Sequence, residues 1–178
     1  QQHQELMLTD LKHLLSCSPI DPMYRPQWPL ARVTPLAPAW LAFDGGTADI
    51  GHDGSGFAFD NELPRHAVLL RPYALANRLV THGEWLAFMD DGGYSDARWW
   101  DWRLVNAIEA PAYWRCDGDQ WTNFTLHGRV PIDAHTPIVH VSYFEADAYA
   151  RWRAVQDGVP CRLPTEAEWE HAAQAHAE

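Results

Sequence analysis

Three capping boxes determine where helices begin in this chain of 178 residues. In a capping box, a Ser or Thr side chain accepts a hydrogen bond from the backbone N–H of a Glu three positions later. The Glu side chain in turn accepts one from the backbone N–H of the Ser or Thr. Each box therefore predicts a helix that starts at the following residue. The boxes pair Thr81 with Glu84, Ser142 with Glu145 and Thr165 with Glu168.

Glycines and a proline predict where helices end. We expect the first capped helix to stop at Gly92-Gly93 and the second at Gly158, because glycine adopts the left-handed conformation that terminates helices. Another helix is predicted over residues 3–15, where leucines recur at helical spacing. Pro19 cannot continue that helix.

Turn residues between short apolar runs predict β-hairpins. Ala39–Phe43 and Ala48–Gly51 flank Gly45-Gly46, which indicates a hairpin that closes at these two glycines. Residues 112–116 and 120–124 flank an Asp-Gly-Asp turn in the same way. Together with the capped helices, these short strands indicate an α+β fold with much irregular chain.

Two further β-prone runs and a proline-rich segment complete the pattern. Residues 66–73 and 74–80 are apolar, and Pro72 implies a bulge or an edge strand. Six prolines between residues 19 and 38 predict an extended, stiff connector, which we interpret as an interdomain strap.

Composition excludes several classes of protein. Acidic residues outnumber basic ones by 24 to 13, and the net charge of -11 does not suit a nucleic-acid surface, which needs clustered cations. The hydrophobic fraction of 47% is too high for a disordered chain. No apolar run approaches the roughly 20 residues that span a bilayer. We therefore expect neither a nucleic-acid nor a membrane partner.

The cysteines and the first residue indicate the setting of the chain. Cys17, Cys116 and Cys161 fit neither a disulfide framework nor a CxxC motif. Unpaired thiols are typical of a reducing compartment, so we predict a cytoplasmic protein. The sequence begins with Gln1 inside a predicted helix, and we expect it to be a fragment of a longer protein.

Ten histidines suggest a metal site, but their spacing argues against one. The chain has no HExxH motif, and His3 and His13 lie on different faces of the predicted first helix. His135 and His140 are expected on opposite sides of a strand. Each histidine taken singly is therefore predicted to be a surface or hydrogen-bonded imidazole.

A run of aromatic residues at positions 99–102 (WWDW) has two possible roles. It could form a stacking platform for a ring or a sugar, or its indoles could be packing anchors in a core. We favour the packing role, because large aromatic side chains supply much buried area to a domain with short regular elements.

Several motifs resemble one enzyme family. The opening QQHQELMLTDLKH (residues 1–13) resembles the end of the HxxxHxE helix in the DinB-like domain of ergothioneine-pathway sulfoxide synthases. The rest of the chain is similar, in the same order, to the formylglycine-generating-enzyme-like domain that follows in those proteins. The motifs that carry this second similarity are FDNELPRH (59–66), LVT (79–81), DGGY (91–94), PIVHVS (137–142) and RLPTEAEWE (162–170).

The resemblance implies a fold and domain boundaries. The fold would be a formylglycine-generating-enzyme-like, C-type-lectin-related irregular α+β fold, preceded by the last helix of a DinB-like four-helix bundle. Residues 1–18 would be that helix, residues 19–38 the strap, and residues 39–178 the second domain without its C-terminal part. One departure is THGEW at residues 81–85, where the family reads TNGEY. The capping box survives it.

The resemblance also implies a reaction. In that family, three histidines of the helix bundle hold a non-haem Fe(II), which uses O₂ to join the thiol of cysteine or γ-glutamylcysteine to Nα-trimethylhistidine (hercynine) as a sulfoxide. His3 matches one iron ligand, Glu5 a residue that orients a ligand, and Gln2 a position that contacts trimethylhistidine. A three-ligand face leaves open positions for substrates and O₂. With one ligand of three, the isolated chain is expected to be inactive.

Two alternatives remain. An ovothiol-type 5-histidylcysteine sulfoxide synthase shares both domains and couples cysteine to histidine at another ring carbon. A non-catalytic binding module is the other, because a fold does not determine function.

Overall fold

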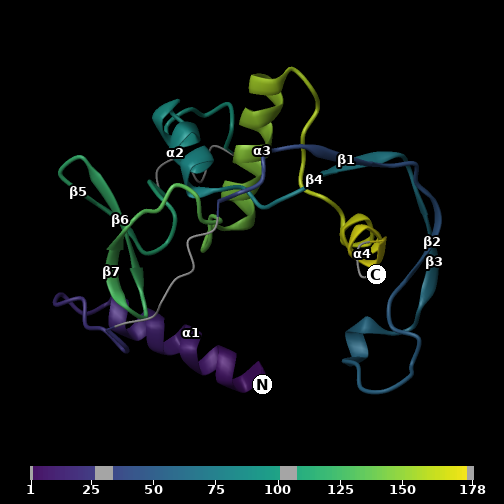
Figure 1. Cartoon of the computed structure of the whole chain (residues 1–178), viewed down its shortest axis with the longest axis horizontal. Helices are drawn as coiled ribbons and strands as arrows, with labels where there is room; N and C mark the ends of the chain where they lie inside the picture. The colour runs from purple at the N-terminus through teal and green to yellow at the C-terminus, as the bar shows by residue number, and fades with distance from the viewer. Residues whose placement is uncertain (1, 27–33, 101–107, 176–178) are drawn as a thin grey trace. The chain divides into compact units, whose positions relative to one another are not determined.

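The computed structural model describes residues 2–26, 34–100 and 108–175 (Figure 1). Contacts within the chain divide it into two compact units. The first combines Gln1–Pro35 with Val80–Cys161, and the second combines Leu36–Leu79 with Arg162–Glu178. Each unit therefore joins segments that are distant in the sequence.

The helices of the first unit begin and end as the capping boxes and glycines predict. Helix α2 spans His82–Asp90 and α3 spans Tyr143–Asp157, each after a complete capping box. Gly158 ends α3 in the left-handed conformation, with a φ of 67°. The predicted first helix is α1, Gln2–Ser16.

Aromatic side chains form the core of this unit, where α2 packs against α3. The rings of Trp85 and Tyr149 stack with their centroids 5.2 Å apart, and the Phe88 ring lies edge-on to both. Trp99 and Trp100 are buried in the same cluster, which confirms their predicted role as packing anchors. The third tryptophan of that run, Trp102, lies outside the described residues.

A three-stranded antiparallel sheet completes the first unit. Its strands are β5 (Trp114–Asp117), β6 (Gln120–Thr125) and β7 (Gly128–Pro131) in this order. Asp117 pairs with Gln120, so the predicted hairpin at this turn is confirmed. Helix α1 lies against β6 (Figure 1).

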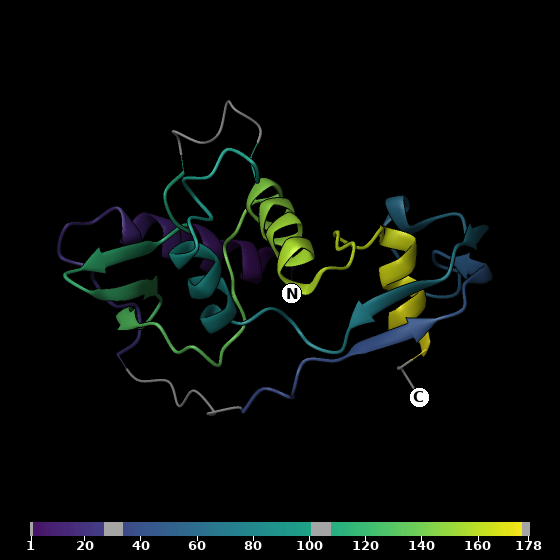
Figure 2. The ribbon, with the colours of Figure 1, turned by 90° about the horizontal axis from the view of Figure 1, so that it is seen from above.

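The second unit is a long β-ribbon with one helix. Its strands are β1 (Trp40–Phe43), β2 (Gly46–Ile50), β3 (His66–Leu70) and β4 (Tyr73–Ala76), and a short 3-10 turn, η1, covers Asp60–Glu62. Helix α4 (Glu166–Ala175) packs on β2 and β3 (Figure 2).

The predicted hairpin at Gly45-Gly46 is wrong. Strand β1 pairs with β4 and β2 pairs with β3, so residues 40–50 run antiparallel to residues 66–76 with one interruption. At that interruption Gly45 has a φ of +74°, and a Cβ placed on it would lie 2.5 Å from the Leu70 carbonyl oxygen. The glycine is thus required by a close backbone approach in a bent ribbon, not by a turn. Pro72, for which the sequence predicts a bulge or an edge strand, lies at the interruption between β3 and β4.

The start of helix α4 is fixed by the third capping box, and a long-range hydrogen bond from Tyr73 attaches the helix to the ribbon. The Glu168 carboxylate accepts hydrogen bonds from the Thr165 backbone N–H at 2.8 Å and from the Arg162 guanidinium at 2.6 and 2.8 Å. The Tyr73 hydroxyl donates to the Glu168 carbonyl at 2.8 Å. These contacts explain why the pKa of Glu168 falls to about 2, chiefly through the Arg162 hydrogen bonds.

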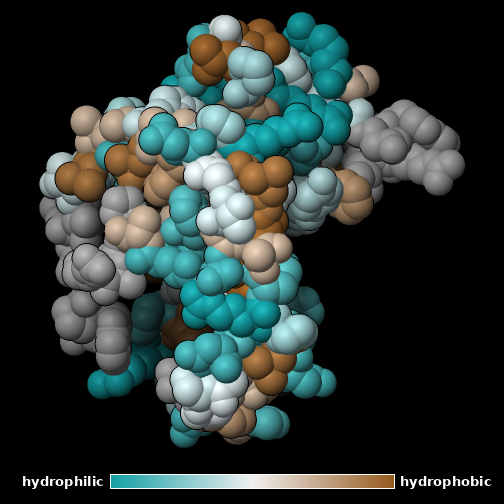
Figure 3. All heavy atoms as spheres, turned by 90° about the vertical axis from the view of Figure 1, so that its right-hand side faces the viewer, coloured by the Kyte–Doolittle hydropathy of each residue, from teal (hydrophilic) through white to brown (hydrophobic). Residues whose placement is uncertain are grey.

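Apolar side chains also reach the surface of the second unit. Phe57 is 83% exposed, Leu69 79% and Trp169 61%. In the view of Figure 3, however, apolar surface is interrupted by polar side chains. None of the helices in the described ranges combines the length and the apolar character that crossing a bilayer requires.

Candidate functional site

The residues that the resemblance singles out lie together at the start of α1. Gln2, His3 and Glu5 are all exposed on its first turns. Nowhere in residues 2–26, 34–100 or 108–175 do three or more His, Cys, Asp or Glu side chains come together as a possible metal site. A single imidazole does not hold Fe(II), which needs several donors. The described residues by themselves therefore do not fit an iron site.

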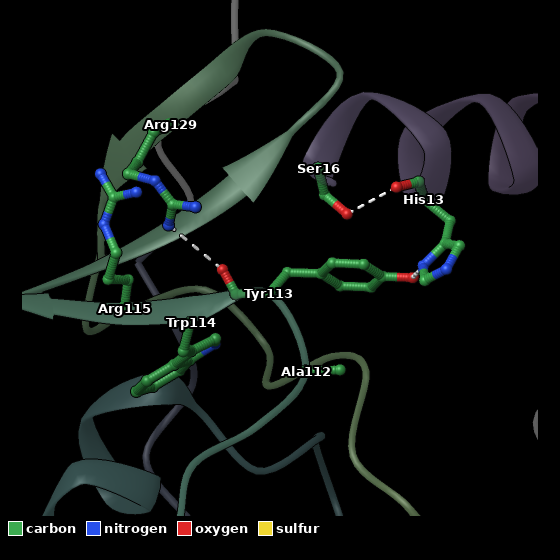
Figure 4. A pocket seen from close by; sticks show the side chains of 7 residues that line it. All are labelled: His13, Ser16, Ala112, Tyr113, Trp114, Arg115 and Arg129. Carbon is green, nitrogen blue, oxygen red and sulfur yellow. Dashed lines mark hydrogen bonds between the residues drawn. The ribbon is translucent and has the colours of Figure 1, made fainter. Parts of the chain in front are cut away.

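A hollow of about 440 Å³ lies further along α1, where the end of the helix meets the sheet (Figure 4). Its polar lining comes from both elements. The Tyr113 hydroxyl lies 3.3 Å from Nδ1 of His13, and the Ser16 hydroxyl donates to the His13 carbonyl at 2.7 Å. The lining residues are His13, Ser16, Ala112, Tyr113, Trp114, Arg115 and Arg129.

Beside this hollow, Lys12 contacts two residues from distant parts of the sequence. Its Nζ lies 2.5 Å from Nε2 of His140 and 4.2 Å from the centroid of the Tyr113 ring. The Tyr113 and His140 rings meet edge to face, with centroids 5.0 Å apart. A cation on the face of an aromatic ring is attracted by the ring quadrupole, so Tyr113 binds the ammonium while His140 accepts its proton.

Within the part of the chain that the structure describes, no carboxylate neutralises the charge of Lys12. Lys12 is 9% exposed, and among the described residues its ammonium forms no ion pair. Burial disfavours the charged form of an amine, and it lowers the pKa of Lys12 to about 8. The pKa of His140 is also lowered, first by burial and then by the nearby Lys12 charge.

A second cluster of charges borders the hollow on the sheet side. Arg129 binds the Asp21 carboxylate with two hydrogen bonds of 3.1 Å, and Arg115 approaches the same carboxylate at 3.2 Å. These guanidinium groups, Arg129 first, lower the pKa of Asp21. The Arg129 Nη1 also donates to the Tyr113 carbonyl at 3.3 Å, which ties this cluster to the hollow (Figure 4).

Backbone strain is concentrated around the same place. Only Asp21, Tyr113 and His140, among the described residues other than glycine, have a positive φ, with values of 43°, 71° and 62°. Such conformations cost energy in side-chain-bearing residues and occur preferentially where function requires a fixed geometry. Three strained residues around one hollow make it the candidate functional site of the first unit.

The chemistry of the site follows from its groups. The Tyr113 hydroxyl and the His13 imidazole can each donate or accept a hydrogen bond, and the Lys12 ammonium is a charged donor. Arg129 and Ser16 supply further donors. The site therefore suits binding of a polar molecule, and its lining residues contain no serine or cysteine paired with a base for nucleophilic attack.

The sequence pattern did not reveal this site. The structure brings His140 to Lys12 across 128 positions, and no spacing rule connects two such residues. The prediction that His140 is a hydrogen-bonded imidazole is confirmed, but its predicted place on a strand is wrong, since residues 132–142 form irregular chain. One signal was available, because Lys12 is the single lysine of the chain.

Comparison with known proteins identifies the relatives of the chain. It is 43% identical over 120 residues to the hercynine oxygenase of Mycobacterium tuberculosis, covering 65% of this chain and 26% of the relative. Identity to the hercynine oxygenase of Mycolicibacterium smegmatis is 37% over 179 residues, and the alignment covers 96% of this chain and 39% of that relative. Identity to the formylglycine-generating enzyme of Streptomyces coelicolor is 36% over 137 residues, and the alignment covers 68% of this chain and 42% of that relative. The chain thus spans less than half the length of each of these relatives.

The family model of the sulfatase-modifying factor enzyme 1-like domain matches residues 29–178. The match includes both predicted hairpin regions, all three capping boxes and the RLPTEAEWE motif. It agrees with the observed mixture of helices and small antiparallel sheets, which is the α+β fold expected from the sequence. The chain therefore belongs to the family of the sulfatase-modifying factor enzyme 1-like domain.

Proposed function

We propose that the chain is part of an O₂-dependent non-haem iron sulfoxide synthase that acts on hercynine. The observation that carries this proposal is the extent of the similarity to the hercynine oxygenase of M. smegmatis. Its alignment covers 96% of the chain, so it necessarily includes at least part of α1, which the family match at residues 29–178 leaves out. The alignment to the formylglycine-generating enzyme of S. coelicolor covers only 68% of the chain.

The proposed reaction joins a thiol to the hercynine imidazole ring. The thiol loses its S–H proton and the ring carbon its C–H proton as the C–S bond forms. One atom of O₂ becomes the sulfoxide oxygen and the other leaves as water with these two protons, so the reaction balances without a further reductant. Cysteine or γ-glutamylcysteine is the proposed thiol substrate.

We assign the first turns of α1 to this chemistry. His3 is proposed as one iron ligand, with the remaining ligands contributed from outside the described residues. Glu5 is proposed to orient a ligand, because residues that hydrogen-bond to metal ligands fix their direction. Gln2 is proposed to contact hercynine. All three side chains are exposed, and thus accessible to such partners.

The proposal includes the domain organisation and setting. Residues 1–18 would be the last helix of a DinB-like iron-binding domain, residues 19–38 the interdomain strap and residues 39–178 the second domain. No disulfide bond joins Cys17, Cys116 and Cys161 to one another, which suits the predicted cytoplasmic location.

The test is an activity assay on the full-length protein that contains this chain. It is incubated with Fe(II), O₂, hercynine and either cysteine or γ-glutamylcysteine, and the products are analysed by mass spectrometry. We expect a sulfoxide whose mass is that of hercynine plus thiol plus one oxygen atom, less two hydrogen atoms. The 178-residue chain alone should give none.

Three outcomes would contradict the proposal. Turnover by the isolated chain would show that His3 needs no further ligands. A product formed from histidine but not from hercynine would indicate the ovothiol-type reaction. Substrate binding without turnover by an iron-loaded protein would indicate a binding module.

A further inference from the structure

Four buried side-chain nitrogen or oxygen atoms in the described part of the first unit have no hydrogen-bond partner. One is Nε1 of Trp99 in the aromatic core, and the other three are Nε2 of His82, Nε1 of Trp114 and Oδ1 of Asn123. A buried donor or acceptor that is left unpaired destabilises the folded state, and most buried polar groups in native proteins are paired with protein or water. Three such atoms in one region therefore require an explanation.

His82 of α2 meets Trp114 of β5, and Asn123 of β6 is the cross-strand neighbour of Trp114. The ring centroids of His82 and Trp114 lie 5.4 Å apart, with the rings at 62° to each other. Trp114 is directly opposite Asn123 in the register of β5 and β6, so their side chains leave the sheet on the same face. Figure 4 shows that the Trp114 indole points away from Arg115 and Arg129, which lie on the other side of the strand.

The environment of His82 fixes which ring nitrogen carries the proton. Nδ1 lies 2.7 Å from the Thr136 hydroxyl oxygen and 3.2 Å from the Asp133 carbonyl. The Thr136 hydroxyl donates to that same carbonyl at 2.9 Å, so its oxygen is an acceptor for Nδ1. Nδ1 must therefore be the donor. Burial lowers the pKa of His82, so the ring is neutral and its buried Nε2 is an acceptor.

The unpaired atoms of these three residues then form a complementary set of one donor and two acceptors. Trp114 Nε1 donates, whereas His82 Nε2 and Asn123 Oδ1 accept. A water molecule can accept one hydrogen bond and donate two, and buried waters typically make about three hydrogen bonds to such groups. We propose that a single internal water molecule binds between His82, Trp114 and Asn123.

The proposal holds for either orientation of the Asn123 amide. If its nitrogen faces the other two atoms, the set becomes two donors and one acceptor. A water molecule satisfies that set as well, accepting from Trp114 and Asn123 and donating to His82. In both orientations, Trp114 Nε1 donates a hydrogen bond to the water and His82 Nε2 accepts one from it.

The water would join three segments that are remote in sequence. His82 is the first residue of α2, and Trp114 and Asn123 lie on β5 and β6. Trp114 follows Tyr113 and contributes to the lining of the hollow. The water would thus support that part of the candidate site from inside the unit.

A crystal structure of the protein at high resolution is the direct test. We expect one density peak about 2.7–3.2 Å from all three atoms. A direct hydrogen bond from Trp114 Nε1 to His82 Nε2, or no density between the three side chains, would overturn the proposal.

Nuclear magnetic resonance provides an independent test in solution. The indole Hε1 of Trp114 should show a cross-peak to a long-lived water, whereas that of Trp152 should show none, because Trp152 Nε1 donates to Asp91 at 2.7 Å. In Asn123→Leu, which removes one partner at similar volume, the Trp114 cross-peak should be lost while the Trp152 signal is unchanged. An undiminished Trp114 cross-peak in this variant would contradict the assignment of Asn123.

Discussion

Nζ of Lys12 lies 2.5 Å from Nε2 of His140, although 128 positions separate the two residues. Two protonated groups cannot approach so closely, because like charges repel at this distance. The pair therefore carries at most one positive charge, and Nζ of Lys12 lies above the face of the Tyr113 ring. This contact joins α1 to the segment that precedes α3.

The first prediction concerns the pKa of Lys12. Its value of about 8 should appear as the midpoint of the pH dependence of labelling with an amine reagent, whereas in denaturant the midpoint should return to the ordinary value of 10.5. The side chain can be followed without interference from other lysines, since the sequence contains one. Peptide mapping separates it from the terminal amine. A midpoint near 10.5 in the folded protein would contradict the burial of the Lys12 ammonium without a carboxylate partner among the described residues.

The second prediction follows from the same shift. Between pH 8 and 10.5 the unfolded chain binds more protons at Lys12 than the folded one, so the free energy of unfolding should rise with pH in this window. Over this pH window, we expect the free energy of unfolding to rise by about 1–3 kcal/mol more than in Lys12→Met, which does not titrate at this position. One pKa unit corresponds to ~1.4 kcal/mol. Urea unfolding at several pH values measures it. Parallel pH profiles of the two proteins would rule out the effect.

The third prediction concerns the backbone at His140. Its φ of 62° is tolerated by Asn better than by Ala, so His140→Ala should be less stable than His140→Asn by about 1 kcal/mol. Both variants lose the imidazole contact to Lys12, and their difference therefore reports the conformational preference. Chemical denaturation provides the comparison. Equal stabilities would show that the left-handed conformation relaxes when the imidazole is removed.

The fourth prediction tests the bend in the β-ribbon. Gly45→Ala should cost more than about 2 kcal/mol, because its Cβ would clash with the Leu70 carbonyl in addition to the strain of a positive φ. Gly46→Ala is the matched control, since its Cβ meets nothing within 4 Å and only the strain of about 1 kcal/mol remains. Thermal unfolding of the two variants separates the clash from the strain. A Gly46 variant as unstable as the Gly45 variant would argue against the clash.

The fifth prediction concerns the proposed iron ligand. In the full-length protein, His3→Ala should abolish sulfoxide formation, and Glu5→Gln should reduce iron affinity or activity by about 10–100-fold, as expected for a residue that orients a ligand. Gln4→Ala, an exposed neighbour on the same helix, is the control and should retain activity. Product formation and bound iron are measured together. Full activity of His3→Ala would remove α1 from the iron site.

Local sequence signals predicted the elements that local interactions stabilise. The boxes at Thr81, Ser142 and Thr165 involve residues three positions apart, so their hydrogen bonds are encoded in the sequence and appear in the structure. The left-handed Gly158 and the hairpin that pairs Asp117 with Gln120 follow for the same reason. The motifs likewise identified the family, because they occur in order along the chain.

Strand pairing was decided by the tertiary structure. Two glycines between apolar runs favour a hairpin, yet Gly46 pairs with Leu70 and Phe43 with Tyr73. The same glycine that permits a turn also permits a close approach of two backbones, and a local pattern cannot distinguish these uses. Only the partner strand, about 25 residues away at the interruption, determines which one occurs.

By itself, the sequence determined the helix starts, the aromatic anchors and the family, because each depends on neighbouring residues or on a motif that is read in order. The tertiary structure alone decided the two polar assemblies of the first unit. The Lys12–Tyr113–His140 contact and the arrangement of His82, Trp114 and Asn123 each join residues from distant segments. Their burial, protonation and unpaired atoms arise from packing, which no local pattern of residues encodes.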